Sequence, residues 1–147
     1  IGDKAFGMCV LLNNIDLSEV TEIGEGAFFH CKALNSVGDL SKVTKIGINT
    51  FFFCKALTSI DLSEVTEIGK GAFFGCEALT SVGDLSQVTK IGDKAFEGCK
   101  ALKDVILPKS FNNNRDLERI GLKLKLKLNQ LQKKGVIMKP STSDTRD

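Results

Sequence analysis

Five cysteines recur along the 147-residue chain at steps of 22 or 23 residues, and such thiols could form disulfides or hold a metal. Disulfide-rich domains usually carry an even number of cysteines at irregular spacing, and zinc sites usually hold cysteines in close pairs. Neither pattern is present, so the spacing favours reduced, buried thiols that act as small apolar side chains. A disulfide between repeats and a metal site are the less favoured alternatives for Cys9, Cys31, Cys54, Cys76 and Cys99.

Four aspartates form a second regular set, and each of them precedes a Leu-Ser pair: Asp16, Asp39, Asp61 and Asp84. If equivalent positions are neighbours about 5 Å apart, their charges repel by roughly 1 kcal/mol per pair even in water. Capping explains such a set when each carboxylate accepts a backbone N–H in the turn that follows. Two alternatives are an acidic stripe that meets a basic partner protein and a stripe that binds a hard cation such as Ca²⁺.

No residue set in the chain is typical of an enzyme. His30 is the one histidine, and a catalytic histidine also needs a partner that positions it. The equivalent positions in other repeats are Met8, Phe53, Gly75 and Gly98, which indicates a variable position. The sequence has no Ser/His/Asp set, phosphate-binding glycine loop or H-E-x-x-H motif. We therefore expect a non-enzymatic protein that needs no cofactor.

The bulk composition restricts the partners. A net charge of +2, from 20 basic and 18 acidic residues, gives no strong field toward nucleic acid or a membrane. We therefore expect no nucleic-acid partner and no membrane insertion. The sequence starts inside the repeat frame at Ile1, without an initiator Met or a signal segment, so we expect a fragment or a processed product.

An internal repeat must position these residues. The segment IGDKAF at residues 1–6 returns at 91–96, and the same Ile-Gly frame recurs at Ile23, Ile46 and Ile68. Repeats of 22 or 23 residues are typical of a solenoid, in which each repeat buries its apolar face against its neighbours. Alternate repeats carry an additional glycine, Gly38 or Gly83, so the duplicated unit has 45 residues and a bulge is expected at each extra glycine.

The pattern within one repeat predicts its elements. Apolar and polar residues alternate near Ile60 and Leu62, which predicts a short strand over 57–62. A second extended segment is predicted over 65–68, where β-branched residues precede a glycine. Residues 71–76 predict a turn, or a single helical turn, that carries one Phe and one Cys into the core. The corresponding phenylalanines are Phe6, Phe28, Phe51, Phe73 and Phe96.

Stacking of repeats also predicts neighbours for many charged and aromatic residues. Opposite charges meet in two columns, Glu22, Lys45, Glu67 and Lys90, and Glu19, Lys42, Glu64 and Gln87. Such exposed pairs favour the register but do not define a binding site. Four further phenylalanines form either a second buried layer or an outward apolar patch that marks a contact: Phe29, Phe52, Phe53 and Phe74.

The frame L-x-x-I-x-L followed by I-G-x-x-A-F-x-x-C resembles the BspA-like, or Treponema-type, leucine-rich repeat, and residues 91–108 show it best. The resemblance implies a right-handed, curved leucine-rich-repeat solenoid of the α/β class, β-rich, with a parallel sheet on its concave face. It also implies a surface or secreted protein that binds host proteins or other cells. The chain departs from the family pattern at Ser63, where a proline is usual, and at Asn49-Thr50, where a small residue and Ala are usual.

Three regions follow from where the repeat ends. We expect a solenoid of about five repeats over 1–108, a C-terminal cap over 109–140 and a mobile tail over 141–147. Leucine alternates with lysine over 122–128, which predicts a capping strand with one basic face. A strand that binds an anionic surface or nucleic acid is the alternative.

The predicted function is binding of another protein or a surface glycan by the exposed face of the predicted strands. Its residues vary between the Leu and Ile columns or belong to the aspartate set: Asn13, Asp16, Asn35, Asp39, Thr58, Asp61, Thr80, Asp84 and Lys103. The alternative is a structural spacer or self-assembling unit of a larger repeat protein.

Overall fold

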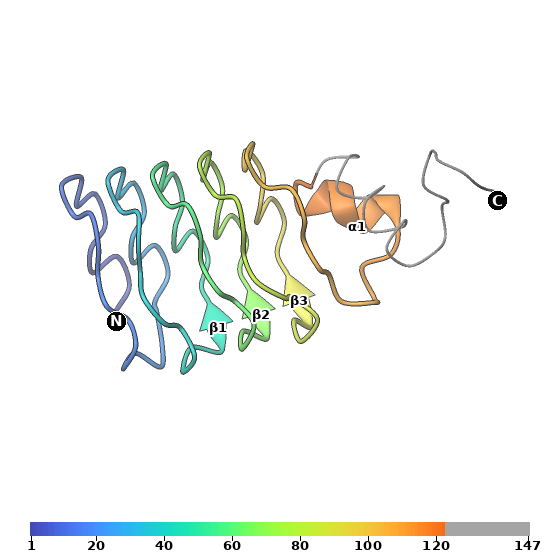
Figure 1. The fold of residues 1–147 in the computed structure, drawn as a ribbon, viewed down its shortest axis with the longest axis horizontal. Helices are drawn as coiled ribbons and strands as arrows, with labels where there is room; N and C mark the ends of the chain where they lie inside the picture. The colour runs from blue at the N-terminus through green and yellow to red at the C-terminus, as the bar shows by residue number, and fades with distance from the viewer. Residues whose placement is uncertain (123–147) are drawn as a thin grey trace, which may run out of the picture.

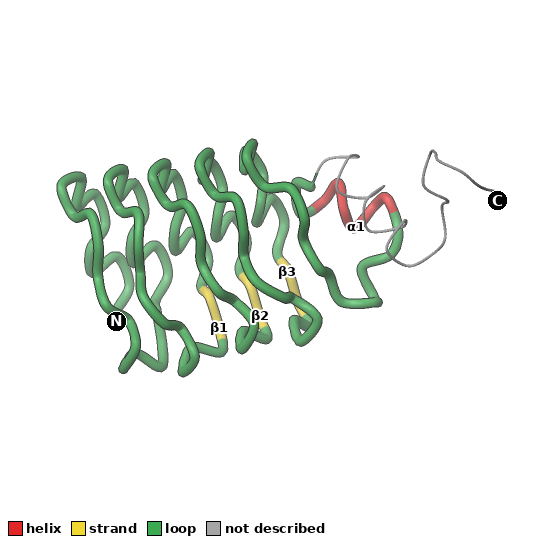
Figure 2. The backbone as a smooth tube through the Cα atoms, in the orientation of Figure 1, coloured by secondary structure: helices red, strands yellow, loops and turns green. Residues whose placement is uncertain are grey.

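The repeats form successive coils that lie side by side in the computed structural model, which describes residues 1–122 (Figure 1). We number the coils by their residues: first 1–22, second 23–45, third 46–67, fourth 68–90 and fifth 91–108. Turns and loops make up most of each coil (Figure 2). Residues 123–147 lie outside the described part, and with them fall most of the strand predicted over 122–128 and the tail predicted over 141–147.

Three short strands, each at the boundary between two successive coils, form a parallel sheet from the second coil to the fifth. Its strands lie in chain order: β1 (Lys45–Ile46), β2 (Glu67–Ile68) and β3 (Lys90–Ile91). Ile46 pairs with Ile68, and Ile68 pairs with Ile91, so the isoleucine column is buried in register. The extended segment predicted over 65–68 therefore contains β2.

The strand predicted over 57–62 was wrong in its extent, because this segment makes only an isolated bridge between Ser59 and Ser81. The physical reason is the side chain of Asp61, two residues after Ser59. The Asp61 carboxylate accepts the N–H of Ser63 at 3.0 Å, which bends the chain into a turn before a longer strand can form.

Along the turn of each coil, successive backbone N–H groups alternate between two kinds of acceptor: a carbonyl of the next coil and a carbonyl of the same turn. In the fourth coil, Phe73 N–H donates to Ala95 O of the fifth coil at 2.8 Å. The next residue, Phe74, instead donates its N–H to Gly71 O of its own coil at 3.1 Å. Every second backbone donor thus closes the turn, and the others join the coils.

This alternation depends on left-handed backbone at two positions in each coil. At these positions φ lies between 55° and 79°. They are Lys4, Gly26, Asn49, Gly71 and Lys94 in one column, and Met8, His30, Phe53, Gly75 and Gly98 in the other. The two columns hold glycine in only some coils, so the other coils carry left-handed strain in a residue with a side chain.

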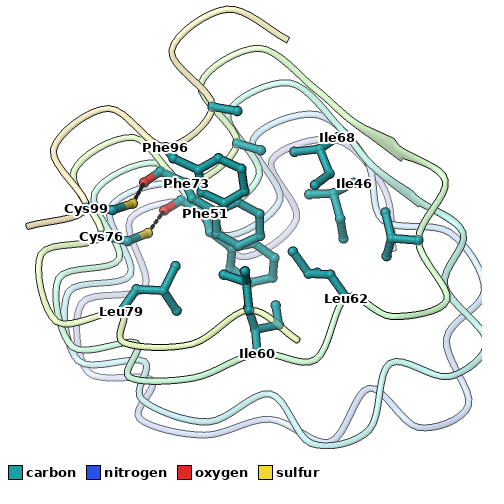
Figure 3. Close-up of a cluster of buried hydrophobic side chains, with 14 of the residues drawn as sticks. Ile46, Phe51, Ile60, Leu62, Ile68, Phe73, Cys76, Leu79, Phe96 and Cys99 are labelled. Carbon is teal, nitrogen blue, oxygen red and sulfur yellow. Dashed lines mark hydrogen bonds between the residues drawn. The ribbon is translucent and has the colours of Figure 1, made fainter. Parts of the chain in front are cut away.

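The frame phenylalanines stack through the core in one continuous column. Successive ring centroids lie 5.4 or 5.5 Å apart, and their planes differ by at most 11°. Figure 3 shows Phe51, Phe73 and Phe96 in this stack, surrounded by the buried Ile and Leu columns. The predicted aromatic core is therefore confirmed.

The cysteines lie beside this stack as free thiols, as the spacing predicted. The Cys76 thiol donates to Phe51 O at 3.1 Å, and the Cys99 thiol donates to Phe73 O at the same distance (Figure 3). Burial raises the pKa of Cys76 well above its usual range and raises that of Cys99 to about 12. Both thiols therefore stay protonated and act as donors between coils.

Ion pairs link equivalent charged positions of neighbouring coils. Lys45 lies 3.6 Å from Glu67, and Lys42 lies 2.6 Å from Glu19, so the predicted pairing of opposite charges is present in both columns. Exposed pairs of this kind stabilise a protein by about 1 kcal/mol or less, which makes them aids to register.

A short helix follows the last coil. Helix α1 (Asn114–Arg119) begins after Asn113, whose side chain accepts the Asp116 N–H. Two carbonyls at its end accept N–H groups of the fifth coil, Arg119 O from Lys94 and Ile120 O from Phe96. The residues at the end of α1 therefore continue the hydrogen bonding that joins one coil to the next.

Removing one ring from the stack tests how much the core depends on it. We expect Phe73→Ala to lower the free energy of unfolding by about 3–5 kcal/mol, because the ring is fully buried between two others. The matched control is Phe74→Ala, which removes a half-buried ring and costs less. Urea unfolding measures both, and equal losses would contradict the assignment of Phe73 to the core.

Left-handed strain can be tested at an exposed lysine. Lys94 has a φ of 58°, so Lys94→Gly should raise the free energy of unfolding by about 0.5–1 kcal/mol, because relief of strain exceeds the added freedom of the unfolded chain. Lys70→Gly is the control, because Lys70 has no positive φ. This variant should lower the free energy of unfolding by about 0.5–1 kcal/mol. The prediction fails if both variants lose stability.

Candidate functional site

All residues predicted to bind a partner lie exposed along one side of the coils, and we call them the polar row: Asn13, Asp16, Asn35, Asp39, Thr58, Asp61, Thr80, Asp84 and Lys103. Backbone hydrogen bonds hold neighbouring members in place. Asn35 N–H donates to Asn13 O at 2.9 Å, and Thr80 N–H donates to Thr58 O at 2.8 Å. The row therefore has fixed spacing across the first and second coils, and across the third and fourth.

Each aspartate of the polar row caps the turn that follows it. The carboxylates accept the N–H groups of Ser18, Ser41, Ser63 and Ser86 at 2.8–3.0 Å. The hydrogen bond from the Ser86 N–H, followed by that from its hydroxyl, holds the pKa of Asp84 below its ordinary value, and Ser18 does the same for Asp16. Capping is thus present at every predicted position, and the carboxylates stay exposed and charged.

The coils are not evenly joined along the polar row. Isolated parallel bridges join the first coil to the second, the third to the fourth and the fourth to the fifth: Asn14–Ser36, Ser59–Ser81 and Asp84–Ile106. Among the described residues, no backbone hydrogen bond joins 34–40 of the second coil to 57–62 of the third. The polar row therefore opens between the second and third coils.

A hollow of about 630 Å³ lies at this opening. Its walls include Asn35, Thr58 and Asp61, which are three of the predicted residues, together with Ser36 and Ser59. The two serines were missed because only variable positions were selected from the sequence. A recurring Ser after Asn35, Thr58 and Thr80 was the signal that could have identified them. The other members of the polar row lie outside this hollow.

The surplus phenylalanines form a second surface feature together with the lone histidine, and we call it the aromatic cluster: Phe29, His30, Phe52, Phe53 and Phe74. Phe52 stacks on Phe74 with ring centroids 5.0 Å apart, and the His30 ring lies 5.2 Å from that of Phe53. Every ring is half-buried. Both interpretations were therefore incomplete, because the rings are neither a buried second layer nor fully exposed.

A separate hollow of about 310 Å³, which we call the aromatic hollow, lies beside this cluster. It is lined by Lys4, Glu25, Gly26, Phe29, His30, Asn49 and Phe52. Phe29 and Phe52 occupy equivalent positions in neighbouring coils, but no ring contact joins them in the part of the chain that the structure describes. Phe29 instead lies over Gly7, where an added Cβ would come within 2.2 Å of its Cε1.

A model of the BspA type leucine-rich repeat region matches residues 1–119 in six copies. The chain belongs to this family. The match runs beyond the fifth coil to the last residue of α1. BspA-type membership implies protein binding in general, and members of the family are typically non-enzymatic.

Two solved structures of bacterial leucine-rich repeat proteins are similar to this chain. A leucine-rich cell-surface protein from Faecalibacterium prausnitzii is 33% identical, with a TM-score of 0.68 over 84% of this chain and 32% of its own. A leucine-rich repeat protein from Bacteroides ovatus is 37% identical, with a TM-score of 0.65 over 75% of this chain and 29% of its own. This chain thus spans about a third of the length of each. No curated protein matches it.

Metal-binding groups and membrane-spanning helices are both absent from residues 1–122. Within that range, no group of three or more His, Cys, Asp or Glu side chains is arranged to hold a metal ion. In the same range, no helix has the length and apolar character needed to cross a membrane.

The capping role of the aspartates predicts a specific response to acid. Because the pKa of Asp84 is lowered by folding, its contribution to stability is complete above its ordinary pKa and is lost as pH falls through the lowered value. Asp84→Asn should keep the turn, since the amide oxygen can still accept the Ser86 N–H, but should remove this part of the acid sensitivity. Asp84→Ala should lower the melting temperature at neutral pH. Melting curves across acidic pH test this, and equal acid sensitivity of wild type and Asp84→Asn would contradict it.

Proposed function

We propose that this chain is a non-enzymatic protein-binding module and that it contacts its partner through the polar row. The observation that supports this most is the opening between the second and third coils, where three predicted residues line one hollow. A protein partner can reach there both hydroxyl and amide side chains. It can also reach the backbone of 34–40 and 57–62 on the sides where these two segments form no hydrogen bond with each other.

The charge of the polar row favours a partner with basic side chains. Asp16, Asp39, Asp61 and Asp84 are all exposed, and capping uses their carboxylates as acceptors without removing their charge. Such a row increases the association rate and the specificity of a complex more than its affinity. Lys103 ends the row in the fifth coil, where Ile106 takes the place of the capping aspartate.

The finer architecture belongs to the same proposal. We infer a right-handed solenoid with the sheet on its concave face, ended by a cap over 109–140. Support comes from α1 and the residues after it, because Leu117, Ile120 and Leu122 are buried against the last coil. A location at the cell surface is supported by the relative from F. prausnitzii, which is itself a leucine-rich cell-surface protein.

Blocking the hollow tests the proposed binding surface. Thr58→Arg places a long, charged side chain in the hollow and should abolish binding to purified extracellular-matrix and serum glycoproteins, measured by surface plasmon resonance against a panel of them. Thr44→Arg is the matched control, because Thr44 is also exposed and its carbonyl also accepts a hydrogen bond from the next coil. Equal binding by the two variants, or no binding by the wild type, would contradict the proposal.

The same samples separate a binding module from a self-assembling unit. Multi-angle light scattering should give the mass of a monomer at every concentration tested. If the mass grows with concentration, and grows equally in wild type and Thr58→Arg, the chain assembles end to end. That result would overturn the binding proposal.

A further inference from the structure

Three of the six described residues that combine a side chain with left-handed backbone line the aromatic hollow. Lys4, His30 and Asn49 have φ values of 56°, 57° and 55°. The equivalent positions hold glycine in other coils: Gly26 and Gly71 in one column, and Gly75 and Gly98 in the other. A left-handed residue with a side chain costs roughly 1–2 kcal/mol, so stability alone favours glycine at these sites. Met8, Phe53 and Lys94 carry the same strain away from the hollow, so the strain supports a function here only together with the fact that three such side chains line one hollow.

The polar side chains at the edge of the hollow have no partners within residues 1–122. Neither a hydrogen bond nor an ion pair is made by the side chains of Lys4, Glu25 or Asn49. They surround the half-buried rings of Phe29 and Phe52. Sites for small ligands typically have apolar walls and a few polar side chains that are free to form hydrogen bonds. The volume of the aromatic hollow, about 310 Å³, is near the lower end of the range for such sites.

We propose that the aromatic hollow binds a neutral pyranose unit of a glycan, at a site separate from the polar row. A pyranose presents an apolar C–H face, which can pack on Phe29 or Phe52, and a rim of hydroxyl groups that donate and accept hydrogen bonds. Glu25 can accept, Lys4 can donate and Asn49 can do both.

The charges of the hollow select against ionic ligands. Lys4 and Glu25 carry opposite charges at the same edge, so the hollow has little net charge to attract an ion. A phosphate group would meet the Glu25 carboxylate, and a cationic side chain would meet the Lys4 ammonium group. A neutral ligand with hydroxyl groups avoids both conflicts, and its donors and acceptors match the two side chains.

Gly7 keeps the hollow open. The position of Gly7 holds Phe29 and Phe52 in the next two coils, and the Phe29 ring occupies the space that a side chain at Gly7 would fill. This displacement prevents Phe29 from stacking on Phe52 in the way that the frame phenylalanines stack. Gly7→Ala should therefore push the Phe29 ring toward Phe52 and reduce the hollow without changing any residue that lines it.

Saturation-transfer NMR tests the site directly on the full 147-residue chain. The probes are lactose, cellobiose and N-acetyllactosamine at millimolar concentration. We expect saturation to pass to the C–H groups of at least one of these sugars. Phe52→Ala and Glu25→Ala should each weaken that binding about tenfold, through loss of a stacking face and of a charged hydrogen-bond acceptor. Glu22→Ala is the matched control, because Glu22 lies outside the aromatic hollow and should leave binding unchanged.

Two further variants separate binding from packing. Gly7→Ala should weaken sugar binding, whereas Gly2→Ala should not, because a Cβ at Gly2 meets nothing within 4 Å. His30→Gly should weaken binding while the melting temperature is kept or raised, since it relieves left-handed strain. The proposal is overturned if none of the sugars receives saturation, or if the sugars bind equally to wild type and Phe52→Ala. It is also overturned if His30→Gly lowers the melting temperature and leaves binding intact, because the cluster would then serve packing alone.

Discussion

Backbone hydrogen bonding between coils is the constraint on which the rest of the structure depends. Because Phe73 N–H reaches the next coil while Phe74 N–H closes its own turn, each coil is held at a fixed distance from its neighbour. That distance places the frame phenylalanines 5.4 or 5.5 Å apart in near-parallel stacks. It also brings the Cys76 thiol to Phe51 O, so a small polar group is satisfied inside the core.

The spacing of the additional glycines accounts for the opening in the polar row. An additional glycine in the second and fourth coils lies against an aspartate of the coil before it, Gly38 against Asp16 and Gly83 against Asp61. Both glycines have positive φ, and the coils are bridged within each of these two pairs. Between the pairs, the second and third coils share no backbone hydrogen bond along the polar row, and the hollow lies there. The 45-residue duplication therefore explains the opening in the polar row as well as a charge pattern.

Side-chain columns could be predicted from the sequence because each one reports a single physical environment. The phenylalanine column, the free cysteines and the capping aspartates were all identified in this way. The extent of the strand over 57–62 could not be, because local alternation does not report the capping turn at Asp61 that ends it. The left-handed positions were also missed, since Lys94 or His30 gives no local sign of positive φ. Comparison with glycine in the same column was the available signal.

Both candidate sites include residues of the second and third coils, so the stability of the junction between these coils matters for both. In repeat proteins each repeat contacts only its neighbours, so a weak junction cannot be supported from a distance. Here the junction keeps the turn-side hydrogen bonds that every pair of neighbouring coils makes. Phe28 N–H donates to Thr50 O at 2.9 Å and His30 N–H donates to Phe52 O at 2.7 Å. Thr50, fully buried where the family usually has Ala, donates its hydroxyl to Gly47 O at 2.8 Å. Strong pairing on one side of the junction thus allows an accessible surface on the other.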